Sequence, residues 1–203
     1  MKKLSATFLA VATFSIATAV PALAQEGSFI VRVRVRALSM QVDNGNSPEV
    51  PAAKISINNK IFPEIDFVYG ITKNISAELV LTYPQKHDVK LNGANIGSVK
   101  HLPPTLTLQY QFAPGSTVNP YVGAGVNYTR FMSVNLPAGI TLDKSSVGGA
   151  LQAGIDLEIA KNTYLNLDYK YVKIGTDVNV GAVKLTKLAI DPSLISVGIG
   201  WKF

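Results

Sequence analysis

The chain of 203 residues is 47% hydrophobic and only 16% charged. Because ordinary globular domains carry about 25% charged residues, this deficit excludes a disordered chain, a coiled coil and a conventional solvated surface. The formal net charge of +6 is too mild and too scattered to indicate a nucleic-acid partner. Cysteine is absent and there are two histidines, so we expect no disulfide framework, no metal and no cofactor.

Residues 1–24 have the organisation of a secretory signal. Lys2 and Lys3 form a basic start, residues 4–20 are apolar and small, and Ala22 and Ala24 complete an A-x-A pattern. The apolar stretch is too short for a transmembrane anchor, since a spanning helix needs about 20 apolar residues. We therefore expect cleavage after Ala24, which leaves residues 25–203 as one exported domain.

From residue 28 onward the hydrophobic pattern has a period of two. In the first run Val31, Val33 and Val35 alternate with arginines, as expected for a strand with one apolar and one polar face. No segment has a convincing helical period. The alternation predicts eight strands, at residues 28–38, 64–69, 75–83, 105–112, 121–132, 147–159, 164–173 and 193–203.

The connections between these strands differ in length on the two rims. Short turns on one rim and long loops on the other are typical of outer-membrane barrels. We therefore predict that residues 25–203 form an all-β fold, an eight-stranded antiparallel transmembrane β-barrel with short periplasmic turns and long extracellular loops. The short connections are 70–74, 113–120 and 160–163, and the long ones are 40–60, 84–104, 133–146 and 174–191.

Alternation alone leaves the direction of the apolar face open, because a soluble lipocalin-like barrel also has eight strands with apolar residues inside. Two features favour an outward apolar face. The polar face is mainly Gly, Ser, Thr, Asn and Gln, which is poor material for a solvated exterior. Aromatic residues gather at the strand ends, where amphipathic rings prefer the membrane interface. The predicted aromatic girdle consists of Tyr69, Tyr83, Tyr110, Phe112, Tyr128, Tyr171, Trp201 and Phe203.

With that orientation the polar face lines the lumen and brings charges of both signs into it. An eight-stranded barrel is just wide enough for side chains to fill, and an unpaired buried ion is costly. Opposite charges are therefore expected to pair and to plug or strongly constrict the interior. This predicted network comprises Arg32, Arg34, Arg36, Glu64, Asp66, Glu78, Asp156, Glu158, Asp168, Lys170 and Lys202.

Two stretches resemble the OmpW/AlkL family of small outer-membrane proteins, namely HLPPTL at 101–106 and NPYVGAGVNY at 119–128. Weaker similarity at 74–79, 149–156 and 191–203 extends the resemblance over most of the exported chain. The resemblance implies an outer-membrane barrel of a Gram-negative bacterium with a narrow apolar channel for passive uptake of small hydrophobic molecules. It assigns no gate residues, because residues 55–64 align only loosely.

The residues themselves fit such a role. The long outer loops can build a hydrophobic funnel, and with a plugged lumen the solute would leave sideways between strands into the bilayer. Pro63 and the Pro103-Pro104 pair lack backbone donors, so they either weaken strand pairing or merely start strands. The candidate wall residues of the funnel are Ile55, Ile57, Ile61, Phe62, Leu102, Leu136, Ile140 and Leu142.

A structural protein or a phage or bacteriocin receptor is the alternative function. Lysines of the outer loops, among them Lys86 and Lys100, are then expected to contact phosphates of lipopolysaccharide. An enzyme is not expected, because His87 and His101 flank one loop and no G-x-S-x-G motif is present. The expected partners are outer-membrane lipid, lipopolysaccharide and small hydrophobic solutes.

Overall fold

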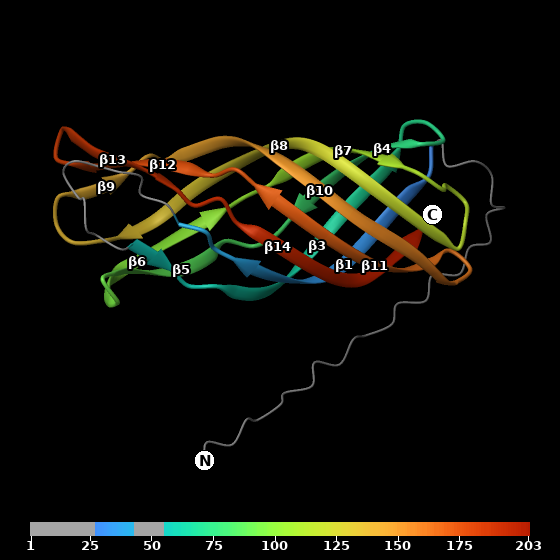
Figure 1. Ribbon diagram of the computed structural model, residues 1–203, viewed down its shortest axis with the longest axis horizontal. Helices are drawn as coiled ribbons and strands as arrows, with labels where there is room; N and C mark the ends of the chain where they lie inside the picture. Colours follow the sequence, from blue (N-terminus) through green and yellow to red (C-terminus); the bar gives the residue numbers. More distant parts are fainter. Residues whose placement is uncertain (1–26, 43–54) are drawn as a thin grey trace, which may run out of the picture.

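The computed structural model describes residues 27–42 and 55–203, so the expected export signal lies outside the described residues. Eight strands form a closed antiparallel wall (Figure 1), and pairing of the first with the last completes it. The predicted eight-stranded antiparallel barrel is thereby confirmed. In wall order the strands are β1 (Phe29–Ser39), β3 (Lys60–Gly70), β4 (Ile75–Leu81), β7 (Thr105–Gln111), β8 (Val118–Asn135), β10 (Ser145–Ala160), β11 (Thr163–Val172) and β14 (Ser193–Lys202).

One rim of the barrel carries the short turns and both ends of the wall. At this rim, on the right in Figure 1, the backbone N–H of Phe203 donates to the Phe29 carbonyl at 2.7 Å. We refer to it as the periplasmic rim and to the opposite one as the outer rim. No helix in the described part of the chain is long and apolar enough to cross a membrane.

The long connections at the outer rim contain strands that the sequence analysis treated as loops. β2 (Ile55–Ile57), β5 (Gln85–Leu91) and β6 (Ala94–Leu102) continue the barrel sheet outward, with β6 paired to the upper part of β8. β9 (Ile140–Leu142), β12 (Gly175–Val180) and β13 (Val183–Ala189) form a separate three-stranded sheet. The missed signal was Asn92-Gly93: both residues have positive φ, 50° and 85°, and such a dipeptide favours a two-residue hairpin turn.

The second barrel strand is longer than expected and includes a proline. It was predicted at 64–69, but β3 begins at Lys60 and passes through Pro63. Pro63 lies opposite Val35 of β1 and beyond Ile65, the last residue of β3 that pairs with β4. It therefore interrupts no β3–β4 ladder, which is why a proline is tolerated inside this strand.

The apolar face of the wall points outward. Val33, Leu151 and Val197 have exposed fractions of 45%, 61% and 46%, whereas the alternating polar residues are enclosed. This arrangement overturns the lipocalin-like alternative. Of the predicted girdle, Tyr69, Tyr110, Phe112 and Phe203 are exposed toward the periplasmic rim and Tyr83 and Tyr128 toward the outer rim, while Tyr171 and Trp201 are half-buried.

Replacing Leu151 by Arg tests the outward face. Leu151 lies midway along β10, so an arginine there would meet the centre of the bilayer and should lower the free energy of unfolding in lipid by ~2–4 kcal/mol. Ile159, also exposed but close to the periplasmic rim, is the matched position, and Ile159→Arg should lose only about 0–1 kcal/mol. Urea titration in lipid vesicles measures both values, and equal losses would contradict the assigned membrane depth.

Candidate functional site

The interior of the barrel wall holds a cluster of ion pairs, which we call the charged plug. Arg34 of β1 is at its centre and is fully buried. Its Nε lies 2.8 Å from Glu64 Oε1 and 2.5 Å from Asp66 Oδ2, and its Nη2 lies 3.1 Å from Glu78 Oε1. Nη1 donates to Asn166 Oδ1 at 3.0 Å. One guanidinium thus joins β1, β3, β4 and β11 across the lumen.

Glu78 of β4 pairs with three cations, two from β1 and one from β11. Besides Arg34, Arg32 Nη1 lies 3.4 Å and Lys170 Nζ 2.7 Å from its carboxylate. Gln152 Nε2 also donates to Glu78 Oε2 at 2.9 Å. Because each partner is buried, these charge-assisted contacts compensate the loss of hydration that burial imposes.

Tyr121 of β8 extends the plug on the opposite wall. Its hydroxyl donates to Asp168 Oδ2 at 2.8 Å and accepts from Asn166 Nδ2 at 3.0 Å, while the Arg32 guanidinium lies 5.5 Å from the ring centroid. The ring occupies the space beside Gly154, its cross-strand neighbour, where a Cβ would collide with the Tyr121 ring. The small residue on β10 is therefore required by the close approach of Tyr121.

Nine of the eleven predicted lumen charges belong to the plug, with exposed fractions of at most 5%. Glu158 and Lys202 do not: both are half-exposed, because each lies at the end of its strand near the periplasmic rim, beyond the packed interior. The plug has four cations and five carboxylates. Its members are Arg32, Arg34, Arg36, Lys170, Glu64, Asp66, Glu78, Asp156 and Asp168.

On the outer side of the plug the interior becomes apolar. Eleven buried residues, 3–8% exposed, pack together there and form what we call the apolar cluster. It draws on β1, β3, β5, β6, β8, β10, β11 and β14 and on the segment around β12 and β13, so the outer strands close over the barrel. The members are Leu38, Phe62, Val89, Val99, Phe131, Ala150, Val172, Ile174, Leu188, Ile190 and Leu194.

The predicted funnel residues divide between two faces of the wall. Phe62 belongs to the apolar cluster, and Ile55, Ile57, Leu136 and Leu142 pack against it. Three do not. Ile61 is 75% exposed on the outer surface. Leu102 is the cross-strand partner of the exposed Arg130 and shares its outward face, and Ile140 is half-buried outside the cluster. Alternation along β3 explains the contrast between Ile61 and Phe62, which the sequence analysis had placed together in a loop.

Arg36 marks the boundary between the two zones. It pairs across the strands with Phe62 of the apolar cluster on one side and with Ser196 on the other. Its Nε lies 2.6 Å from Glu64 Oε2 and donates to Ser196 Oγ at 3.0 Å. The next inward-facing residue along β1 is Leu38, a member of the cluster. Arg36 is therefore both the last residue of the plug and the floor of the apolar cluster.

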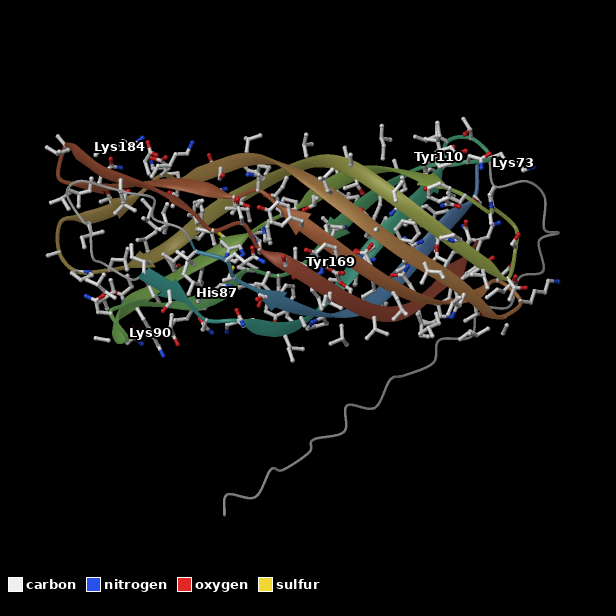
Figure 2. The ribbon with its side chains drawn as sticks, in the orientation of Figure 1. Lys73, His87, Lys90, Tyr110, Tyr169 and Lys184 are labelled. Carbon is white, nitrogen blue, oxygen red and sulfur yellow. The ribbon has the colours of Figure 1, made fainter. Side chains whose placement is uncertain are left out.

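Two histidines face inward from the strands that extend the barrel. His87 of β5 and His101 of β6 stack with ring centroids 4.8 Å apart, and both are buried. Figure 2 shows His87 at the outer end of the molecule, far from Lys73 and Tyr110 at the periplasmic end. Burial lowers the pKa of His101 to about 3, with a further contribution from His87, and burial also lowers the pKa of His87. The pair is therefore neutral, and it packs like an aromatic pair.

At one seam of the wall two neighbouring strands lack a backbone ladder. β3 pairs with β4 only up to Ile65, and β5, which continues beyond β4, pairs with β2 instead of the start of β3. The rings of Phe62 and Tyr83 bridge this seam edge to face, 6.4 Å apart. The Pro103-Pro104 break is different, because both carbonyls accept from Asn127 Nδ2, at 3.2 and 3.1 Å. The two prolines directly precede β7, as expected for prolines that start a strand.

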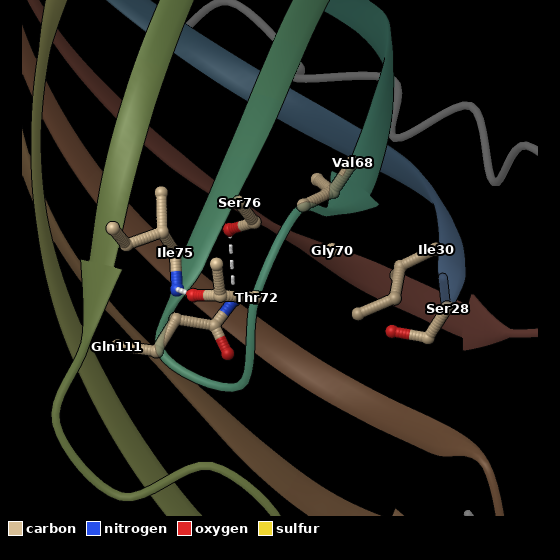
Figure 3. A pocket seen from close by; sticks show the side chains of 8 residues that line it. All are labelled: Ser28, Ile30, Val68, Gly70, Thr72, Ile75, Ser76 and Gln111. Carbon is tan, nitrogen blue, oxygen red and sulfur yellow. Dashed lines mark hydrogen bonds between the residues drawn. The ribbon is translucent and has the colours of Figure 1, made fainter. Parts of the chain in front are cut away.

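The periplasmic mouth holds a small recess (Figure 3). Its volume of about 10 Å³ accommodates one water molecule at most. Ser28 and Ile30 line it from β1 and its approach, with Gln111 on the opposite side. The recess thus provides no continuation of a path through the plug.

The comparisons with known proteins agree with this architecture. The OmpW family matches residues 25–203. An outer-membrane protein of Sinorhizobium fredii, y4mB, is 38% identical over 85% of this chain and 79% of its own, and outer membrane protein W of Escherichia coli is 32% identical over the full length of both. The dibenzothiophene metabolism operon protein PahQ of Pseudomonas aeruginosa is 26% identical over 90% of this chain and 92% of its own. The crystal structure of OprG from Pseudomonas aeruginosa superposes with a TM-score of 0.77 at 27% identity, covering 89% and 99% of the two chains.

Removing the central guanidinium should both destabilise the barrel and open its interior. Arg34→Ala leaves Glu64, Asp66 and Glu78 short of a partner, and breaking a buried pair typically costs about 3–5 kcal/mol. We expect that loss in urea titration and a higher single-channel conductance in planar bilayers. Lys73→Ala, at the exposed periplasmic turn, is the control and should change neither. Unchanged conductance of Arg34→Ala would show that the ion pairs are not what closes the lumen.

The histidine pair predicts acid sensitivity of the outer strands. An imidazole with an ordinary pKa of 6.5 in the unfolded chain and about 3 in the folded one leads the unfolded state to bind more protons as the pH falls. Stability present above pH 6.5 is therefore lost progressively toward pH 3, by roughly 2–3 kcal/mol at pH 4.5 for His101. Hydrogen exchange of β5 and β6, corrected for intrinsic rates, measures the loss. His101→Phe should abolish most of this acid-induced loss of stability. If the pH dependence of His101→Phe equals that of the unaltered protein, the loss does not arise from His101.

Proposed function

Because the chain belongs to the OmpW family of outer-membrane β-barrels, we propose that it takes up small apolar molecules through its apolar cluster and releases them sideways into the outer membrane. The observation that carries the proposal is the order of the two interior zones, the apolar cluster and the charged plug, along the barrel axis. An apolar zone enclosed by the outer strands lies directly on a zone of buried ion pairs. A molecule that enters the first meets ion pairs in the second, so its path must turn.

The bore itself is unsuited to apolar transit. Ion pairs between 2.5 and 3.7 Å long connect five strands at the height of the plug. An apolar solute passing between them would separate buried charges and offer them no hydrogen bonds in return, which is strongly unfavourable. The plug therefore acts as a floor that keeps solutes in the outer half of the barrel.

The seam between β3 and β5 is the exit that the geometry favours. Above Ile65 no backbone ladder joins β3 to β4, so a solute there displaces side chains without breaking strand pairing. Phe62 lies inside this segment in the apolar cluster, and Ile61 is its neighbour on the lipid side. A relative whose name associates it with dibenzothiophene metabolism, PahQ, supports an apolar and aromatic class of solute.

A charge at the lipid side of the seam should block release. Ile61→Arg places a guanidinium where the solute would enter the bilayer and should lower uptake of octane about tenfold, or ~1.4 kcal/mol. Val147 is the matched position, 76% exposed against 75% for Ile61, but it lies on β10, away from the seam. Uptake by cells producing each variant, with protein amounts equalised, measures the effect. Equal uptake by Ile61→Arg and Val147→Arg would reject the lateral exit, and no uptake by the unaltered protein would reject transport.

A cationic row on the outer surface favours a contact with lipopolysaccharide. Lys86 and Lys100 lie directly opposite each other on β5 and β6, and Arg130 is on the adjacent β8, all on the outward face. None has a salt bridge within the described chain. Arg130 follows the girdle residue Tyr128 by two positions, so the row lies at the height of the phosphates of the outer leaflet. Lys86→Glu with Lys100→Glu should weaken retention by lipopolysaccharide-containing vesicles several-fold but leave retention by zwitterionic vesicles unchanged, and equal weakening would reject the contact.

A further inference from the structure

The floor of the apolar cluster is not apolar throughout. Arg36 is 5% exposed, and its cross-strand partner is Phe62 of the cluster. Leu38 and Leu194, also of the cluster, are the next inward residues along β1 and β14. A guanidinium therefore lies directly beneath the apolar side chains, enclosed with them and screened from bulk water.

The hydrogen-bonding capacity of this guanidinium is only partly used. An arginine side chain offers five N–H donors. Nε of Arg36 is engaged by Glu64 and Ser196, whereas Nη2 is buried and has no hydrogen-bond partner within the described residues. A buried donor without a partner is costly. The site therefore favours an occupant that supplies an acceptor at this point.

We propose that the apolar cluster binds apolar molecules that carry one neutral hydrogen-bond acceptor at one end, such as ketones, aldehydes or esters, with the acceptor oxygen bonded to Nη2 of Arg36. The inference rests on the proposed uptake function and names the chemical class of its solutes. The hydrocarbon part of the ligand lies among Leu38, Phe62 and Leu194, and its polar end lies against the plug.

The charge of the plug selects a neutral acceptor over an anion. The positive charge of Arg36 is already compensated by Glu64, which it shares with Arg34. The plug as a whole has four cations and five carboxylates, so it has no spare positive charge for a carboxylate ligand. A ketone oxygen accepts a hydrogen bond without adding charge, and a plain hydrocarbon leaves the donor unpaired.

Binding of 2-octanone, octane and octanoate to the full-length protein in lipid nanodiscs tests the inference. The three probes have the same chain length, and empty nanodiscs correct for partition into lipid. Arg36→Lys keeps the positive charge beside Glu64 but lacks the second terminal nitrogen of the guanidinium. It should lower the ratio of bound 2-octanone to bound octane about tenfold, or ~1.4 kcal/mol. Leu38→Ala is the matched control, because it removes only apolar contact and should weaken both probes equally.

Each outcome decides a separate point. A ratio unchanged in both Arg36→Lys and Arg36→Met overturns the role of Arg36, and preference for octanoate overturns the neutral class. Octane binding with no ketone preference overturns this inference but leaves uptake of apolar molecules standing, whereas binding of none of the probes overturns both. If Arg36→Met fails to show heat-modifiable migration on gels, the folded Arg36→Lys variant decides.

Discussion

The desolvation of nine charged side chains is the constraint on which the rest of the barrel depends. A carboxylate or guanidinium taken out of water is tolerated only when its partners are close and well oriented, and here those partners come from strands distant in the sequence. Arg32 reaches Asp156 at 2.5 Å, 124 residues away, and Lys170 reaches Glu78 at 2.7 Å. This pairing of buried charges depends on the register of the wall, on the glycine beside Tyr121 and on the polar inner face.

The same compensation divides the interior into two zones with different chemistry. The members of the plug are held by ion pairs to several strands, whereas the apolar cluster is held by packing. Arg36 belongs to both zones, and Phe62 connects the cluster to the unpaired part of β3. This arrangement is the basis of the proposed sideways route, because β3 lacks a backbone ladder to β4 at the height of the cluster.

Much of this architecture could be predicted from the period of the sequence, and the rest depends on contacts that a period does not encode. Val33 and Arg34 occupy successive positions of one strand and therefore lie on opposite faces. Once the apolar face is assigned to membrane lipid, Val33 is predicted to point outward and Arg34 into the lumen. Glu158 and Lys202 obey the same alternation, but they are exposed because they lie near the ends of their strands. Alternation indicates which face a residue occupies and does not indicate its position along the barrel axis. The sequence does not distinguish Ile61 from Phe62, because a proline at position 63 indicates the end of a strand. The proline is accommodated only because β4 stops at Leu81, which is a property of a different segment.

The charged residues of the plug come from several strands of the wall, so the neutralisation of their charges depends on closure of the barrel. β1 carries three of the four cations, and its two neighbours in the wall, β3 and β14, come from opposite parts of the chain. β3 supplies Glu64 to Arg34 and Arg36, but Arg32 finds its carboxylates only on β4 and β10. We therefore expect insertion into the membrane to be cooperative, because all charges of the interior are paired only when the cylinder is complete.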